Sequence, residues 1–127
     1  MHIPKVLAID YGTVRVGTAI SMHTLADPLE ILPNDATIFE GLRKICNEHG
    51  VEQIVVGLSE NDMAQQTKKF VEELKKHIQL PISFTDETLS SYSVHHKLAT
   101  AKKSKRSGDI DHYAAAEFLQ NWLDEKY

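Results

Sequence analysis

Three acidic residues far apart in the sequence, Asp10, Glu87 and Asp111, are the candidates for chemistry in this chain. Asp10 ends a short apolar run and Glu87 follows another β-type stretch, so both are predicted at the carboxyl ends of strands. Asp111 begins the last predicted helix on the same face as Ala115 and Phe118, the face expected to press on the sheet. Three carboxylates at one edge would repel one another unless a divalent cation neutralised them.

Oxygen ligands without clustered Cys or His suit Mg²⁺ or Mn²⁺. Two such ions can activate a water and stabilise the leaving oxygen in phosphodiester cleavage, as in two-metal-ion hydrolases. A basic stretch directly before Asp111 would supply positive charge for phosphates, and it contains Lys102, Lys103, Lys105 and Arg106. The pattern therefore predicts a metal-dependent enzyme acting on phosphate esters.

Each of these features also has a purely structural explanation. Asp10 could accept hydrogen bonds from the amides of Gly12 and Thr13, as in an Asx turn. Asp111, or Asp109 beside it, could stabilise the amino end of the helix. The basic stretch could be a solvated loop. The three acids favour a site only if they converge.

The elements expected to position these acids alternate between strands and helices. Strands are predicted at 6–9, 16–20, 29–32, 53–57 and 81–85, and helices at 37–49, from 59 or 61 to 78, weakly at 91–98, and at 109–126. The first three strands should be joined by hairpins, with a turn at Asp27–Pro28, and the helical crossings should make the first, fourth and fifth strands parallel. The sequence thus predicts an α/β fold with a mixed five-stranded sheet flanked by helices. The carboxyl ends of its parallel strands would form one edge, where such sheets bind ligands.

Composition sets limits on the function. A length of 127 residues fits one domain, 1–127, and 42% hydrophobic with 25% charged residues indicates a globular chain. The net charge of −4 argues against a general polyanion binder, so nucleic acid would need a local patch. The single cysteine, Cys46, excludes an internal disulfide and is expected to be buried. No apolar run approaches membrane-spanning length, so a cytoplasmic protein without membrane contact is expected.

Four motifs occur in order along nearly the whole chain. They are Asp10-Tyr11-Gly12-Thr13 with Arg15 and Gly17, Ile54 to Leu58, Asp86 to Ser91, and Lys105 through Asp111 to Ala116. In these motifs the chain resembles the YqgF family of RNase H-like nucleases, also described as Holliday junction resolvases. The resemblance implies an RNase H-like fold, divalent metal at Asp10, Glu87 and Asp111, and maturation of the 5′ end of pre-16S rRNA, with DNA junctions as the older proposal. The sequence departs from the family pattern at Met22, at Thr88 and at 59–62.

The leading hypothesis is an endonuclease for structured RNA, with branched DNA as the second choice. Asp10 would bridge the metals, Glu87 and Asp111 would complete their ligation, and Arg15 with the basic stretch would grip the backbone. A different class is a non-catalytic RNA-binding or ribosome-assembly module. A third reading takes residues 10–13 as the phosphate loop of an actin-like ATPase or sugar kinase, but that architecture needs two such domains. The chain is expected to act as a monomer or homodimer.

Overall fold

The computed structural model describes residues 2–58, 63–86 and 107–127, without the side chains of Asp86 and of residues 107–113. Its elements are β1 (Val6–Asp10), β2 (Arg15–Met22), β3 (Leu25–Pro33), α1 (Ile38–His49), β4 (Gln53–Leu58), α2 (Met63–His77), β5 (Ile82–Asp86) and α4 (Ser107–Lys126). The weak helix predicted at 91–98, the basic stretch at 102–106 and the predicted helix start at 59 or 61 lie outside the described residues. Within the described part of the chain, no helix is both long and apolar enough to cross a membrane.

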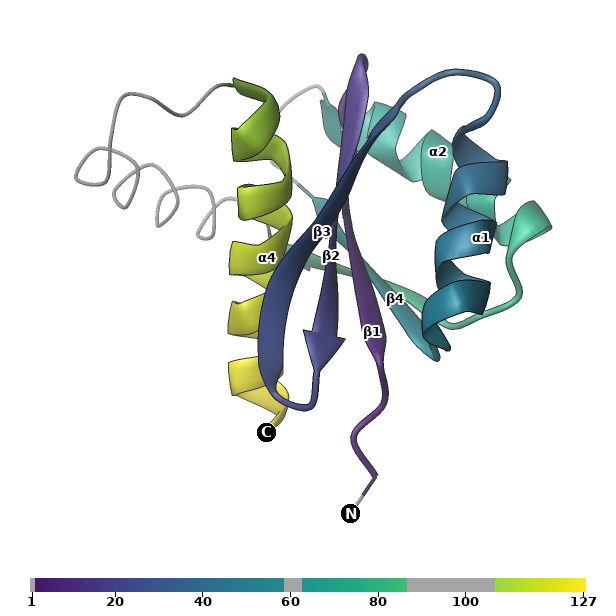
Figure 1. Ribbon diagram of the computed structural model, residues 1–127. Coiled ribbons are helices and arrows are strands. Elements are labelled where there is room, and N and C mark those ends of the chain that lie inside the picture. The colour runs from purple at the N-terminus through teal and green to yellow at the C-terminus, as the bar shows by residue number, and fades with distance from the viewer. Residues whose placement is uncertain (1, 59–62, 87–106) are drawn as a thin grey trace.

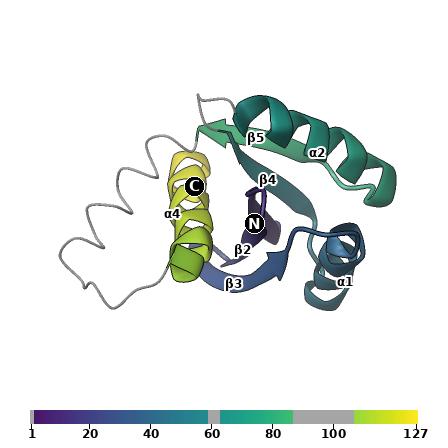
Figure 2. The same cartoon turned by 90° about the horizontal axis from the view of Figure 1, so that it is seen from above.

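The five strands form one mixed sheet in the order β3-β2-β1-β4-β5 (Figure 1). β1 and β2 are antiparallel, as are β2 and β3, whereas β4 is parallel to both β1 and β5. The predicted sheet, with three strands joined by hairpins and two parallel crossings, is therefore confirmed. Helices α1 and α2 lie on one face and α4 on the other (Figure 2).

Each face of the central strand β1 has its own apolar core. Leu7 and Ile9 belong to the cluster under α1 and α2, whereas Val6 and Ala8 belong to the cluster under α4. All four side chains are fully buried, which explains why this strand is an unbroken apolar run and not an alternating one. The largest fully buried helix side chains are Leu42 and Leu74 on the first side and Phe118, Leu119 and Leu123 on the second.

Strand β3 is longer than its sequence suggests. The predicted turn at Asp27–Pro28 is wrong, because the strand runs through both residues from Leu25–Pro33. β3 is an edge strand, where proline is tolerated because it need not donate to a second neighbour. A bulge opposite Thr18 interrupts its pairing with β2, and the Thr18 hydroxyl donates to the Glu30 carbonyl and accepts from the Glu30 amide.

The ends of helices α1 and α4 follow the local sequence only in part. Gly50 stops α1 at φ 66°, in the left-handed conformation that glycine adopts at low cost. Thr37 precedes α1 as predicted, but its hydroxyl donates to the Asp35 carboxylate and forms no capping bond. Together with a bond from the Thr37 amide, this contact holds the pKa of Asp35 below its usual value. α4 begins at Ser107, two residues before the predicted start.

Candidate active site

Asp10 is the last residue of β1, between strands on both sides. Its Cα is paired with Gly17 of β2, and the residue before it, Ile9, is paired with Val56 of β4. The four residues before Asp10 are fully buried and Asp10 itself is half-buried, so the acid lies where the sheet core opens to solvent. A carboxylate in such a position is fixed by a rigid strand, which suits a ligand that must hold a defined direction.

A turn of four residues, Tyr11 to Val14, follows Asp10 and leads into β2. The Tyr11 ring lies 4.7 Å from the Phe70 ring of α2, centroid to centroid. The Asn34 side chain donates a 2.7 Å hydrogen bond to the Gly12 carbonyl. A Cβ on Gly12 would lie 2.5 Å from the Arg15 carbonyl oxygen, so glycine is required here for close approach and not for a positive φ.

The parallel strands bring the ends of β4 and β5 to the same edge as Asp10. In the register of the sheet, Leu58 is paired with Asp86, the last residue of β5. Glu87 follows Asp86 directly and lies outside the described residues. The structure therefore confirms the strand ends at this edge, and the position of the Glu87 carboxylate stays a prediction.

Helix α4 reaches the same edge from the other face of the sheet. In its later half, Gln120 donates to the Thr24 carbonyl and accepts from the Ala26 amide, at the β2–β3 hairpin beside the start of β1. The helix thus runs opposite to β1, and its beginning lies toward the carboxyl edge (Figure 1). Ala115 and Phe118 are fully buried against the sheet, which confirms the predicted helix face. Asp111 lies one turn before Ala115 on this helix, and its side chain is not among the described ones.

Among the described side chains, no group of three or more His, Cys, Asp or Glu could hold a metal ion. Of the three predicted ligands, only the Asp10 side chain belongs to that set. The convergence of Asp10, Glu87 and Asp111 is therefore neither confirmed nor contradicted.

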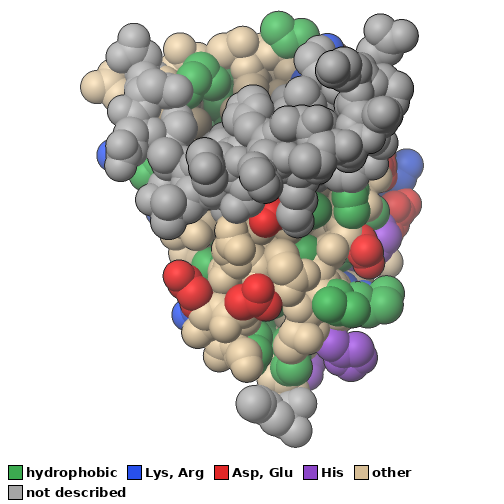
Figure 3. Space-filling model, turned by 90° about the vertical axis from the view of Figure 1, so that its left-hand side faces the viewer, with side chains coloured by type: hydrophobic (Ala, Val, Ile, Leu, Met, Phe, Trp, Pro, Cys, Tyr) green, Lys and Arg blue, Asp and Glu red, His purple; other side chains and the backbone are tan. Residues whose placement is uncertain are grey.

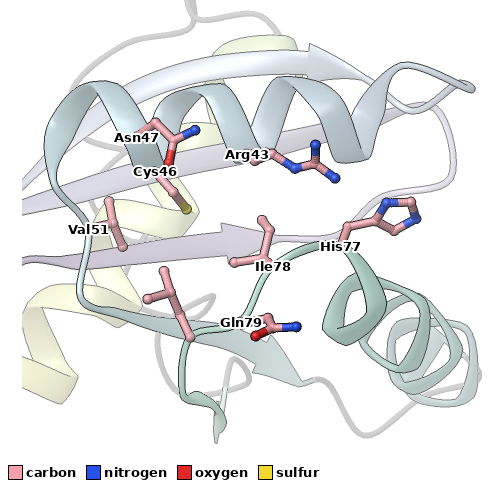
Figure 4. A pocket seen from close by; sticks show the side chains of 8 residues that line it. Arg43, Cys46, Asn47, Val51, His77, Ile78 and Gln79 are labelled. Carbon is pink, nitrogen blue, oxygen red and sulfur yellow. The ribbon is translucent and has the colours of Figure 1, made fainter.

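A pocket of about 270 Å³ lies at the opposite edge of the sheet, next to the segments that precede β4 and β5 (Figure 4). It is lined by Arg43, Cys46, Asn47, Val51, His77, Ile78, Gln79 and Leu80. The pocket does not include any of the predicted site residues. Cys46 is only 6% exposed, as the sequence predicted, and burial raises the pKa of its thiol from 9.0 to about 11.

Cys46 should therefore be a poor nucleophile in the folded protein. At pH 8 the raised pKa lowers the thiolate fraction roughly a hundredfold, so labelling should be limited by opening of the structure. Since the unfolded thiol ionises first, Cys46 should also make stability fall as the pH rises from about 9 to about 11. Urea midpoints at pH 8 and pH 10.5 measure this fall, which should be smaller in Cys46→Ala. Equal falls in the two proteins would contradict the prediction.

Comparison with known proteins gives one consistent result. The sequence model of the RuvX family, described as a Holliday junction resolvase, matches residues 4–125. A relative from Sulfurihydrogenibium sp. is 35% identical over 94% of this chain and 90% of its own length. Another from Geobacillus thermodenitrificans is 35% identical over 96% of this chain and 99% of its own length. Both are named "Putative pre-16S rRNA nuclease".

Among solved structures, RuvC of T. thermophilus in complex with a Holliday junction substrate superimposes with a TM-score of 0.63 at 13% identity. The match covers 98% of this chain and 96% of that chain. At this identity the likeness shows the fold alone, and it confirms the RNase H-like class that the sequence resemblance implied.

Proposed function

The chain belongs to the RuvX family, and from this premise we propose that it is a metal-dependent endonuclease for structured nucleic acid. We take the 5′ end of the 16S rRNA precursor as its substrate, following the names of its relatives. The observation that supports this best is the position of Asp10, a half-buried acid at the end of the central strand. The ends of β4 and β5 and the beginning of α4 lie at the same edge.

The acids expected at this edge would suit a hard divalent cation. Asp10, Glu87 and Asp111 would offer carboxylate oxygens only, the donor set that Mg²⁺ and Mn²⁺ prefer. Asp10 is partly withdrawn from water, where a carboxylate is costly unless a cation or donors compensate it. When bound, one or two such ions would supply a deprotonated water and neutralise the leaving oxygen.

The chain itself would position the substrate and hold these acids. Arg15 begins β2 at the edge where β1 ends, and its guanidinium would contact a phosphate beside the scissile one. Lys102, Lys103, Lys105 and Arg106 would contact the flanking backbone as the chain approaches α4. The rigid strand β1 would keep the Asp10 carboxylate in place while the nucleic-acid backbone is bound.

Two substrates in parallel test this proposal. The purified protein is incubated with Mn²⁺ or Mg²⁺ and either an RNA spanning the 5′ boundary of 16S rRNA or a four-way DNA junction, with EDTA controls. Faster cleavage of the RNA supports the proposal, and loss of cleavage in EDTA supports the metal. Faster cleavage of the junction would favour a resolvase, the description its family has. Binding of RNA without any cleavage would favour a non-catalytic module.

The basic segment should provide much of the affinity for RNA. Figure 3 shows acidic side chains spread over the described surface of the α4 side, with basic ones at its margins. Replacing Lys102, Lys103, Lys105 and Arg106 by Ala should therefore weaken binding and lower the slope of log K against log salt by about 3, at roughly 0.7 per phosphate contact. Fluorescence anisotropy between 50 and 300 mM salt measures this slope.

The matched control replaces four exposed lysines of α2, Lys68, Lys69, Lys75 and Lys76, by Ala. This variant has the same net charge as the first. If only the net charge mattered, both variants would lose the same RNA affinity and the same salt slope. An equal fall of the slope in both variants would contradict a specific role for the segment 102–106.

A further inference from the structure

We propose that Asn34 is a positioning residue for Asp10: it holds the backbone of the turn at 11–14, and the affinity of the site for its divalent cation depends on this hold. The inference rests on the proposed function, because it takes Asp10 as a metal ligand. It assigns a role to a residue that is 22 positions from Gly12 in the sequence and contacts the turn through its side-chain amide.

Asn34 makes two hydrogen bonds to the turn. Its side-chain Nδ2 donates to the carbonyl of Gly12 at 2.7 Å, and its backbone amide donates to the carbonyl of Val14 at 3.0 Å. Both acceptors belong to the stretch between β1 and β2, where the ladder between these strands provides no pairing. Truncating the side chain removes the bond to Gly12 and keeps the bond from the backbone, so the hold of the side chain can be tested by itself.

The rest of the turn is fixed by contacts that leave little freedom. The Tyr11 ring packs on Phe70, which in turn stacks on Phe39 of α1 at 5.4 Å. Gly12 lies so close to the Arg15 carbonyl that no side chain would fit. These contacts fix the α2 side and the interior of the turn, and Asn34 fixes it from the end of β3, whose last pair joins Pro33 to Arg15.

Asp10 joins the rigid strand β1 to this turn. Asp10 is the last residue paired with β2, at Gly17, so β1 holds its backbone on the amino side and the turn holds it on the carboxyl side. A displacement of about 1 Å at a reacting group can lower the rate a hundredfold. Some groups orient a metal ligand without binding the metal themselves. Removing such a group typically lowers metal affinity or activity by about 10- to 100-fold.

The test compares Asn34→Ala with Gln120→Ala. Gln120 also donates from a side-chain amide to a turn carbonyl, that of Thr24 at 2.8 Å, but at the other edge of the sheet. Mn²⁺ binding is followed by paramagnetic broadening of the Gly12 amide signal, and cleavage of RNA is measured over the same Mn²⁺ range. Amide hydrogen exchange at residues 12–14 and urea midpoints show whether each variant is folded. Asn34→Asp, which keeps the shape and replaces the donor, is a second variant for the exchange measurement.

We expect Asn34→Ala to raise the Mn²⁺ concentration for half-broadening and for half-maximal cleavage by about tenfold or more. Exchange at residues 12–14 should become faster in both Asn34 variants, and Gln120→Ala should match the parent in both measurements. An unchanged Mn²⁺ midpoint in Asn34→Ala, or an equal shift in Gln120→Ala, would overturn the inference. Parent protein that binds Mn²⁺ but cuts no RNA would refute the proposed function, while the broadening midpoints still decide the role of Asn34. Parent protein that binds no Mn²⁺ would refute both.

Discussion

Asp10→Asn should lower the rate of RNA cleavage by about a thousandfold or more at saturating Mn²⁺. Stabilisation of charge by a bound metal contributes several kcal/mol to the transition state, and each 1.4 kcal/mol corresponds to about a factor of ten. The amide has nearly the shape of the carboxylate, so the strand β1 and its buried neighbours should be undisturbed. Single-turnover cleavage, the urea midpoint and RNA binding are measured together, and only the first should change strongly.

Asp27→Asn is the matched control for this experiment. Asp27 is an exposed acid in the edge strand β3, paired with Ile20 and distant from the carboxyl edge in the register of the sheet. The same change of charge and shape there should leave cleavage within about twofold of the parent. Should Asp10→Asn cut as fast as Asp27→Asn, the assignment of Asp10 to the site would be wrong.

Phe118→Ala should produce the largest loss of stability of any single substitution considered. Phe118 is fully buried between α4 and the sheet, and replacing a buried Phe by Ala costs about 3–5 kcal/mol. Since small domains are stable by only about 5–15 kcal/mol, this is a large share of the free energy of unfolding. The loss also affects the proposed site, because Phe118 anchors the helix that contains Asp111. Urea denaturation monitored by circular dichroism measures it.

Phe84→Ala gives the comparison for an aromatic residue that is not enclosed. Phe84 lies on the edge strand β5 and is 40% exposed, so its truncation removes less apolar area from the core. We expect its effect to be less than half that of Phe118→Ala. Similar losses for the two variants would show that α4 is not anchored through Phe118.

The sequence predicted those parts of the fold in which local pattern and burial agree. The unbroken apolar run before Asp10 indicated a central strand, and the structure buries it completely. The helical spacing of Phe70, Val71 and Leu74 is typical of a single buried helix face, and all three side chains are in the core. The helical connections are long enough to make the first, fourth and fifth strands parallel. It could therefore be predicted that the carboxyl ends of these strands lie at one edge of the sheet.

What the sequence did not predict depends on contacts between distant residues. Pro28 suggested a turn, and only the position of β3 at the sheet edge makes it compatible with a strand. Asn34 follows a proline, as many turn residues do, and its bond to Gly12 exists only when β3 returns beside β2. No local signal distinguishes such a residue. The convergence of Asp10 with Glu87 and Asp111 is likewise a tertiary property, and it stays a prediction.

α4 is the only described helix on its face of the sheet, and this arrangement has a consequence for biosynthesis. Because α4 is encoded after every strand, the sheet and helices α1 and α2 leave the ribosome before the only described element that covers Val6, Ala8 and Val55. Translation proceeds from the amino end, so the nascent chain exposes this apolar surface until its final helix emerges. Premature termination before α4 should therefore release a fragment that exposes this apolar surface and tends to aggregate. Chaperones should bind the full-length chain mainly near the end of its synthesis.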